Sequence, residues 1–258
     1  MAAALITGAS SGIGLELARI FAKEKIDVIL VARSEDKLKT LAAELQQQFN
    51  ITVHVLAKDL SHYNTAKEIF DWCNQNNIAV DYLVNNAGVG DFGFFAESDW
   101  TKQEQMINLN VTALTYLTHL FLPAMVQRKF GKIMNVASTA AFQPGPLMSV
   151  YFATKAFVLH FSEAIANELH GSGVTVTALC PGATESGFMA AAAMDDSGLF
   201  KGKKVPSSKV VAEYGYKAMQ KGKRVAIHGA MNYIMANGIR FAPRNLVTAV
   251  VRYIQKEV

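Results

Sequence analysis

The chain has 258 residues, of which 51% are hydrophobic and 18% are charged, and its formal net charge is +4. This size suits one large or two small globular domains, and the Lys and Arg residues are spread along the chain instead of forming the basic blocks typical of nucleic-acid-binding proteins. Cys73 and Cys180 are far apart, and neither they nor the six histidines show metal-ligand spacing. We therefore expect a cytoplasmic protein with reduced thiols, no metal site and no nucleic-acid partner.

No signal peptide or membrane span is expected. The apolar run at residues 1–7 has no basic segment before it and no cleavage site, so the mature protein is expected to start here. Two long uncharged stretches, residues 109–127 and 133–154, contain Asn, His, Gln, Gly or Pro residues that a lipid-facing helix would not accept readily.

Short apolar or β-branched segments alternate with amphipathic helical windows along most of the chain. This order is typical of right-handed β-α-β units around a parallel sheet. The predicted strands are residues 3–7, 28–32, 52–57, 82–85, 132–137, 175–179 and 224–227. Serines precede three predicted helices: Ser34 before residues 35–48, Ser61 before residues 62–76, and Ser207 or Ser208 before a helix that ends near residue 220. The sequence predicts one α/β domain over residues 1–258, with a doubly wound, seven-stranded parallel sheet of the Rossmann type.

Two segments near the end of the chain do not follow the alternation. Residues 186–206 are small and apolar and follow the sixth predicted strand. Because such sheets bind ligands beyond the C-terminal ends of their strands, we predict a substrate lid here, with a plain surface excursion as the alternative. Residues 240–258 form a basic, amphipathic helical tail, which we expect to pack on the domain or on a second subunit; docking on a membrane surface is the alternative.

A glycine-rich turn joins the first predicted strand to the helix that follows it. Gly8, Gly12 and Gly14 have the spacing Gly-x-x-x-Gly-x-Gly. Such a turn lets the backbone approach a pyrophosphate, whose charge is met by unpaired N–H groups at the N-terminus of the helix. The residues expected to bind a dinucleotide here are Gly8, Ser10, Ser11, Gly12, Ile13 and Gly14.

The end of the second predicted strand indicates which dinucleotide binds. An acidic residue there would accept hydrogen bonds from the ribose and repel a 2′-phosphate, whereas an arginine accommodates that phosphate. This strand ends without an acid, and Arg33 follows it directly. We therefore predict NADP(H) in preference to NAD(H); a solvated loop cation is the alternative for Arg33.

A tyrosine and a lysine have the spacing of an acid/base pair. Tyr151 and Lys155 are four residues apart in a predicted helix, so both lie on one face. A free tyrosine, with a pKa of about 10, is a poor base at neutral pH, but an adjacent ammonium favours the phenolate and lowers that pKa. Ser138, at the end of the fifth predicted strand, has a hydroxyl that could hold a substrate oxygen.

Together these motifs resemble the short-chain dehydrogenase/reductase family in its short, single-domain branch, and loosely its bacterial ketone and 3-oxoacyl reductases. The resemblance covers about residues 5–186 and depends on residues 7–14, Asn85, Asn86, Ala87, Gly88, Asn110, Ser138, Tyr151, Lys155, Pro181 and Gly182. It implies that Tyr151 donates or removes a proton, that Lys155 lowers the pKa of this tyrosine and holds the nicotinamide ribose, and that Ser138 orients the carbonyl.

The resemblance also implies supporting roles. Asn110 would hold a water molecule that completes a proton relay, with Asn108 as the alternative. The further cofactor-binding residues that it implies are Asp59, Leu60, Asn86, Ala87, Gly88, Pro181, Gly182, Thr184 and Ser186. Asp59 could instead only cap the helix after it, and Asn85 and Asn86 could be plain turn formers. Members commonly form homodimers or homotetramers through the helices corresponding to residues 111–129 and 151–169, so an oligomer is expected by analogy.

We expect residues 89–95, residues 142–148 and the lid at residues 188–200 to form the walls of the substrate pocket. Their side chains are mainly apolar, namely Phe92, Phe94, Phe95, Phe142, Leu147, Met148, Phe188 and Met189. Such walls suit a lipophilic ketone or aldehyde. The sequence therefore predicts an NADP(H)-dependent oxidoreductase that transfers a hydride between nicotinamide and a carbonyl or secondary alcohol. One alternative is a catalytically silent, dinucleotide-binding regulatory protein, although the intact Ser138, Tyr151 and Lys155 argue against it. The chain length and the glycine spacing oppose a nucleotide-sugar epimerase or dehydratase.

Overall fold

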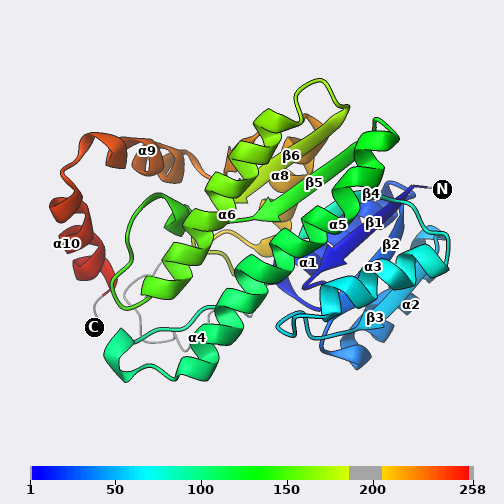
Figure 1. Ribbon diagram of the computed structural model, residues 1–258, viewed down its shortest axis with the longest axis horizontal. Helices are drawn as coiled ribbons and strands as arrows, with labels where there is room; N and C mark the ends of the chain where they lie inside the picture. The colour runs from blue at the N-terminus through cyan, green and yellow to red at the C-terminus, as the bar shows by residue number, and fades with distance from the viewer. Residues whose placement is uncertain (1, 186–204, 256–258) are drawn as a thin grey trace.

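Seven parallel strands form one sheet in the order β3-β2-β1-β4-β5-β6-β7 in the computed structural model, which describes residues 2–185 and 205–255 (Figure 1). The strands are β1 (Ala3–Thr7), β2 (Asp27–Ala32), β3 (Val53–Ala57), β4 (Val80–Asn85), β5 (Gly131–Val136), β6 (Val174–Cys180) and β7 (Val225–Ile227). No strand end differs from the predicted one by more than two residues. The predicted parallel, Rossmann-type sheet is therefore confirmed.

Helices cover both faces of this sheet, which is why its strands are apolar almost throughout. All five residues of β1 are buried. One face is covered by α1 (Gly12–Lys23), α2 (Glu35–Phe49) and α8 (Ser208–Gln220), and the other by α3 (Thr65–Gln75), α5 (Leu114–Gln127) and α6 (Ser149–Glu168). The strand order reverses between β1 and β4, which opens a crevice at the C-terminal ends of the central strands.

One helical stretch, residues 100–127, joins α4 (Trp100–Ile107), a π-helical turn η2 (Asn108–Ala113) and α5. Within the described residues it is the one helix long and apolar enough to cross a membrane by length and composition. Leu117, Phe121 and Met125 of this helix are, however, buried in the core beside β4 and β5. Part of its hydrophobicity is therefore explained by its place in the core.

Of the three predicted helix starts, only the one after Ser61 differs from the structure. Ser34 does precede α2, but its side chain makes no capping hydrogen bond. Ser61 does not cap α3, because the Oδ1 atom of Asp59 accepts hydrogen bonds from the N and Oγ atoms of Ser61 at 2.9 and 2.8 Å. These bonds hold a local turn, and α3 begins only at Thr65.

Three elements follow β7: the helix α9 (Ala230–Gly238), a 3-10 turn η4 (Ile239–Phe241) and the helix α10 (Arg244–Gln255). Of the two helices, α9 was not predicted. Figure 1 shows α9 and α10 at one end of the molecule, away from the sheet. The predicted helical tail is present as α10, and it packs on the domain as expected, because Val247 and Val251 are buried with Met148 and Phe152. The predicted lid lies outside the described residues except for its last two positions.

Candidate active site

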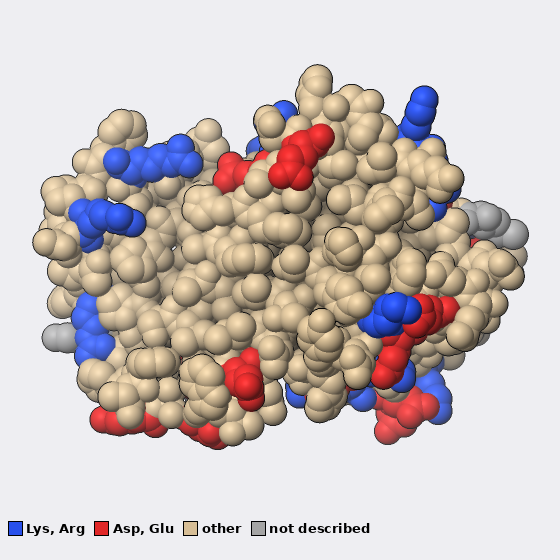
Figure 2. Space-filling view, viewed as in Figure 1, with Lys and Arg blue, Asp and Glu red and all other residues tan. Residues whose placement is uncertain are grey.

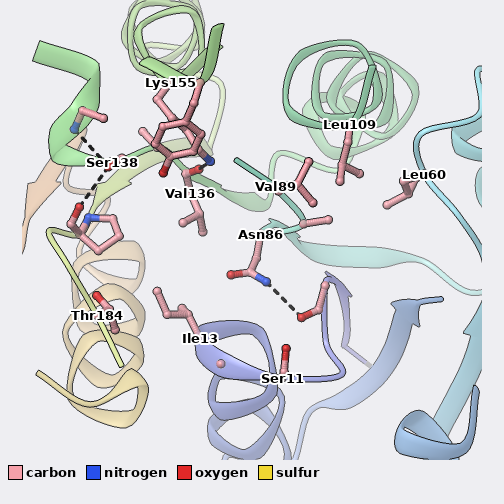
Figure 3. A pocket seen from close by; sticks show the side chains of 18 of the residues that line it. Ser11, Ile13, Leu60, Asn86, Val89, Leu109, Val136, Ser138, Lys155 and Thr184 are labelled. Atoms are coloured by element: carbon pink, nitrogen blue, oxygen red, sulfur yellow. Dashed lines mark hydrogen bonds between the residues drawn. The ribbon is translucent and has the colours of Figure 1, made fainter. Parts of the chain in front are cut away.

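A pocket opens at the C-terminal ends of the central strands, where the strand order reverses (Figure 3). Most of the predicted site residues line it, namely Gly8, Ser10, Ser11, Gly12, Ile13, Arg33, Asp59, Leu60, Asn86, Ala87, Gly88, Ser138, Tyr151, Lys155, Pro181, Gly182 and Thr184. Gly14 and Asn110 lie behind this lining, and Ser186 lies outside the described residues. Figure 3 shows Ser11 and Ile13 on the opposite side of the pocket from Ser138 and Lys155.

The three glycines of the glycine-rich turn lie where a side chain would be strained or would collide. Gly8 and Gly12 have φ angles of +66° and +58°, a region that favours glycine. A Cβ atom on Gly14 would collide with the carbonyl oxygen of Gly8 and the Nδ2 atom of Asn86. The helix α1 begins at Gly12, so unpaired N–H groups of its first turn lie at the pocket edge. This backbone cradle fits the pyrophosphate of a dinucleotide.

Asn86 holds the cradle against β4. Its Nδ2 atom donates hydrogen bonds to the carbonyl oxygens of Thr7 at 2.9 Å and Gly8 at 3.2 Å. The Oγ1 atom of Thr7 in turn accepts hydrogen bonds from the N atoms of Asn86 and Ala87 at 2.9 and 3.0 Å. These contacts fix the two strand ends that form the floor of the pocket, so Asn86 is more than a turn former.

Asn85, the other asparagine of this motif, points into the core instead. Its Nδ2 atom donates hydrogen bonds to the Oδ1 atom of Asn135 at 2.9 Å and the Oγ1 atom of Thr118 at 3.1 Å. Asn85 thus joins β4 to β5 and α5 behind the site, so it too is more than a turn former.

Two cations lie at the end of the pocket farthest from Tyr151, beside β2 and β3. The Nη1 atom of Arg33 is 4.0 Å from the Oδ2 atom of Asp59, and the Arg33 side chain is 72% exposed. Burial opposes ionisation of Asp59, but hydrogen bonds from Ser61 and the charge of Arg33 outweigh it and lower the pKa of this carboxyl. Lys58 also lines the pocket, and its Nζ atom is paired with Glu68 at 2.7 Å. The sequence analysis missed Lys58, although its place directly after β3 was a usable signal.

Tyr151, Lys155 and Ser138 meet where α6 crosses the end of β5. The Nζ atom of Lys155 lies 5.8 Å from the ring centre of Tyr151 and donates a 2.8 Å hydrogen bond to the carbonyl oxygen of Val136. The Oγ atom of Ser138 accepts a hydrogen bond from the N atom of Ala140 at 3.1 Å, and its hydroxyl also bonds to that of Tyr151. The predicted proton-transfer residues therefore form one group.

The pKa of Tyr151 differs from the expected lowering. Burial raises it to about 12, and the hydrogen bond with Ser138 opposes this rise only in part. Burial also lowers the pKa of Lys155 to about 8. The cost of placing a charge in this poorly solvated site is therefore the main influence on both pKa values, and Tyr151 holds its proton at neutral pH.

Asn110 lies in the π-helical turn η2, a geometry that often marks functional sites. Its Oδ1 atom accepts a hydrogen bond from the N atom of Val89 at 3.0 Å, and its Nδ2 atom donates to the carbonyl oxygen of Val89 at 2.9 Å and to Thr154 at 3.1 Å. Asn110 is buried whereas Asn108 is half-buried, which supports the choice of Asn110. Its side chain joins the loop after β4 to α6, and the water it would hold stays a prediction.

The predicted substrate walls are correct only in part. Val89, Gln143 and Met148 of the predicted segments line the pocket, together with Ala140 and Phe152, but Met148 is the only described member of the expected apolar side chains that does so. The other described members do not line the pocket. Phe92 packs behind the lining residues Met148 and Phe152, and Phe142 packs against another core cluster. Phe94 and Phe95 are exposed, and the carbonyl oxygen of Leu147, whose φ is +69°, accepts a hydrogen bond from the N atom of Gly93. Phe188 and Met189 lie outside the described residues. The polar Gln143 lies in the predicted wall segment 142–148, although only the apolar side chains of that segment were expected to shape the pocket.

Comparison with known proteins agrees with this geometry. A family model described as "short chain dehydrogenase" matches residues 2–197. The chain belongs to the short-chain dehydrogenase family. The chain is 34% identical over 185 residues to a very-long-chain 3-oxoacyl-CoA reductase of Rattus norvegicus. That match covers 69% of this short-chain dehydrogenase but only 58% of the rat protein, so the chain spans less than two thirds of this relative.

Two solved structures match nearly the whole chain. A short-chain dehydrogenase from Sphingobium yanoikuyae in complex with NADPH has a TM-score of 0.84 and 33% identity, and the match covers 93% of this chain and 94% of that one. A bulky-bulky ketone specific alcohol dehydrogenase from Comamonas testosteroni has a TM-score of 0.80 and 29% identity, with 93% and 92% covered. These proteins share the fold and the family of this short-chain dehydrogenase.

Proposed function

We propose that this short-chain dehydrogenase is an NADP(H)-dependent oxidoreductase acting on a carbonyl or secondary alcohol of a lipophilic substrate. The observation that supports this most strongly is the convergence of Tyr151, Lys155 and Ser138 on one pocket whose opposite side is the glycine-rich cradle. A nicotinamide bound here would supply or accept the hydride. The protein has to supply a proton, orient the substrate oxygen and bind the dinucleotide.

Tyr151 is suited to the acid role in the direction of reduction. Burial keeps its phenol protonated at neutral pH, and the hydroxyl of Ser138 lies within hydrogen-bonding distance of it. A carbonyl oxygen placed between the two hydroxyls could accept a hydrogen bond from each and then the proton of Tyr151. Lys155, whose ammonium lies beside this ring, would stabilise the phenolate that remains.

The preference for NADP(H) is supported by the charge at the far end of the pocket. Arg33 is exposed there, Lys58 lines the same end, and β2 ends without an acidic residue. Two cations and no carboxylate directly after β2 favour a ligand with a 2′-phosphate. The solved Sphingobium relative is in complex with NADPH.

A lipophilic substrate is supported by the pocket wall around Tyr151. Met148 and Phe152 are buried there beside Ala140, and Gln143 is the one amide among the described lining residues of this region. No Lys or Arg other than Lys155 lines the described pocket near Tyr151. Such a wall favours an apolar ketone or aldehyde over a charged one.

The expected oligomer and location also remain proposals. Val126 and Phe157 are exposed on α5 and α6, the helices through which we expect two copies to pair. Cys73 and Cys180 are both free and buried, which suits the reducing cytoplasm.

The deciding experiment is NADPH oxidation, followed by absorbance, with diketones, 3-oxoacyl esters, aromatic aldehydes and steroid ketones. Wild type is expected to reduce at least one apolar ketone, and Tyr151→Phe is expected to lose about a thousandfold in kcat while still binding NADPH. Tyr116→Phe, a tyrosine on α5 outside the pocket, is the matched control. Tight NADPH binding without turnover on any substrate would favour the alternative of a non-catalytic binding protein.

A further inference from the structure

The last helices carry an unusual concentration of exposed apolar side chains. Nine of the eighteen large apolar side chains exposed among the described residues belong to residues 230–255: Met231, Tyr233, Ile234, Met235, Phe241, Leu246, Val250, Tyr253 and Ile254. We call this set the C-terminal apolar face. Phe241, in the turn between α9 and α10, is 91% exposed. Exposed apolar patches of this kind mark interaction surfaces.

The outward side of α10 is not needed to attach this helix to the domain. Val247 and Val251 point inward and are buried with Met148 and Phe152. Leu246, Val250 and Ile254 are spaced four residues apart, so they form a second apolar stripe one position away from the buried one. The helix is therefore apolar on two adjoining sides, of which the domain covers one.

All charges on this segment are positive. Residues 230–255 contain Arg240, Arg244 and Arg252 and no Asp or Glu. Arg252 lies over the exposed ring of Phe94, in the loop before α4, with 4.8 Å between the guanidinium carbon and the ring centre. Figure 2 shows Lys and Arg side chains within a largely uncharged surface at the end of the molecule formed by α9 and α10.

The exposed apolar side chains and the uniformly positive charge of residues 230–255 together favour a lipid surface over a second copy of the chain as the partner. A two-fold contact between copies would bring the same arginines toward one another with no carboxylate in the segment to pair with them. An anionic membrane attracts those arginines and takes up the apolar side chains, and Tyr and Phe side chains favour the depth of the lipid headgroups. We propose that the C-terminal apolar face docks in the plane of an anionic membrane surface, with α9 and α10 lying in the interface.

The test is sedimentation of the full chain with vesicles of phosphatidylcholine alone or mixed with phosphatidylglycerol. We expect binding to the anionic vesicles that added salt weakens, and much weaker binding to phosphatidylcholine. Phe241→Ser should lower the partition coefficient about tenfold, the effect of one large apolar side chain that stays in water. Arg240→Gln combined with Arg244→Gln should lower it by a similar factor on the anionic vesicles only.

Matched variants distinguish binding through this surface from nonspecific adsorption to vesicles. Val250 on α10 and Val210 on α8 are 47% and 49% exposed, so Val250→Ser should weaken binding severalfold and Val210→Ser should not. Arg224→Gln, a substitution of an exposed arginine directly before β7, is the control for charge. The proposal is overturned if the wild type does not bind anionic vesicles or if Val210→Ser and Val250→Ser bind them equally. It is also overturned if Phe241→Ser abolishes self-association, measured by ultracentrifugation, and leaves vesicle binding unchanged. None of these outcomes depends on the proposed enzymatic activity.

Discussion

The Nζ atom of Lys155 donates a 2.8 Å hydrogen bond to the carbonyl oxygen of Val136, the last residue of β5. This contact ties the ammonium of α6 to the end of the central sheet, 5.8 Å from the ring centre of Tyr151. The lysine is buried, and burial lowers its pKa from 10.5 to about 8. The ammonium of Lys155 is thus held beside the phenol in a place where the protein solvates it poorly. Because the folded state must carry this poorly solvated charge at neutral pH, Lys155 should lower the free energy of unfolding there.

The first prediction concerns the pH dependence of that cost. The unfolded chain binds the Lys155 proton with the ordinary pKa of 10.5, whereas the folded chain binds it with a pKa of about 8. Between these values the unfolded state holds more protons, so the contribution of Lys155 to the free energy of unfolding rises with pH. From about pH 7 to about pH 10, wild type should gain about 2 to 3 kcal/mol relative to Lys155→Met.

Urea denaturation of both proteins at several pH values measures this difference. Lys102→Met, which replaces an exposed lysine on α4, should follow the wild-type profile. Parallel pH profiles for wild type and Lys155→Met would show that the buried ammonium carries no such cost.

A second prediction concerns the backbone cradle. A Cβ atom on Gly14 would collide with the Gly8 carbonyl and the Asn86 amide, so Gly14→Ala must move the turn that faces the dinucleotide. We expect a loss of about 1 to 3 kcal/mol in stability and NADPH binding weakened by at least about tenfold. Gly238→Ala is the control, because open space surrounds that helical glycine. Fluorescence titration with NADPH measures the affinity of each variant. Wild-type affinity for both variants would contradict the assignment of this turn as the cradle.

A third prediction concerns Asn110. Its side chain makes three hydrogen bonds that join the loop at Val89 to Thr154 of α6, and it is buried. Asn110→Ala leaves those groups unpaired, which should lower the free energy of unfolding by about 2 to 4 kcal/mol. Asn108→Ala, at the half-buried neighbouring asparagine, should change it by less than about 1 kcal/mol. Equal effects at the two positions in thermal or urea unfolding would remove the distinction between them.

The sheet was predictable because its strands are buried on both faces and therefore apolar along their whole length, as β1 is. The start of α3 was not, because the hydrogen bonds from Ser61 to Asp59 compete with helix formation over the next residues. The helix α9 was missed for a different reason. Met231, Ile234 and Met235 are exposed, so its apolar residues do not mark one buried face.

The site residues that come shortly after a predicted strand could be predicted, because the ends of parallel strands lie at the pocket. Ser138 after β5 and Arg33 after β2 are examples. The substrate wall was not, because a phenylalanine serves a pocket, a core or a surface equally well. Phe94 lies under Arg252, which comes from a distant part of the chain. The raised pKa of Tyr151 depends on burial by the assembled fold, which four-residue spacing to Lys155 does not reveal.

The last prediction tests the choice of dinucleotide at Arg33, which lines the pocket beside Lys58. Because Lys58 is paired with Glu68 and Arg33 is 72% exposed and 4.0 Å from Asp59, Arg33 is the freer of the two cations to meet a 2′-phosphate. Arg33→Gln should weaken NADPH binding about tenfold, the effect of one lost charge-assisted hydrogen bond, and leave NADH binding unchanged. Lys37→Gln, at an exposed lysine on α2 outside the pocket, should alter neither. Calorimetric titration of both dinucleotides checks the result: equal losses for NADPH and NADH would assign Arg33 to the shared part of the cofactor, and no loss for either would make it a solvated loop cation.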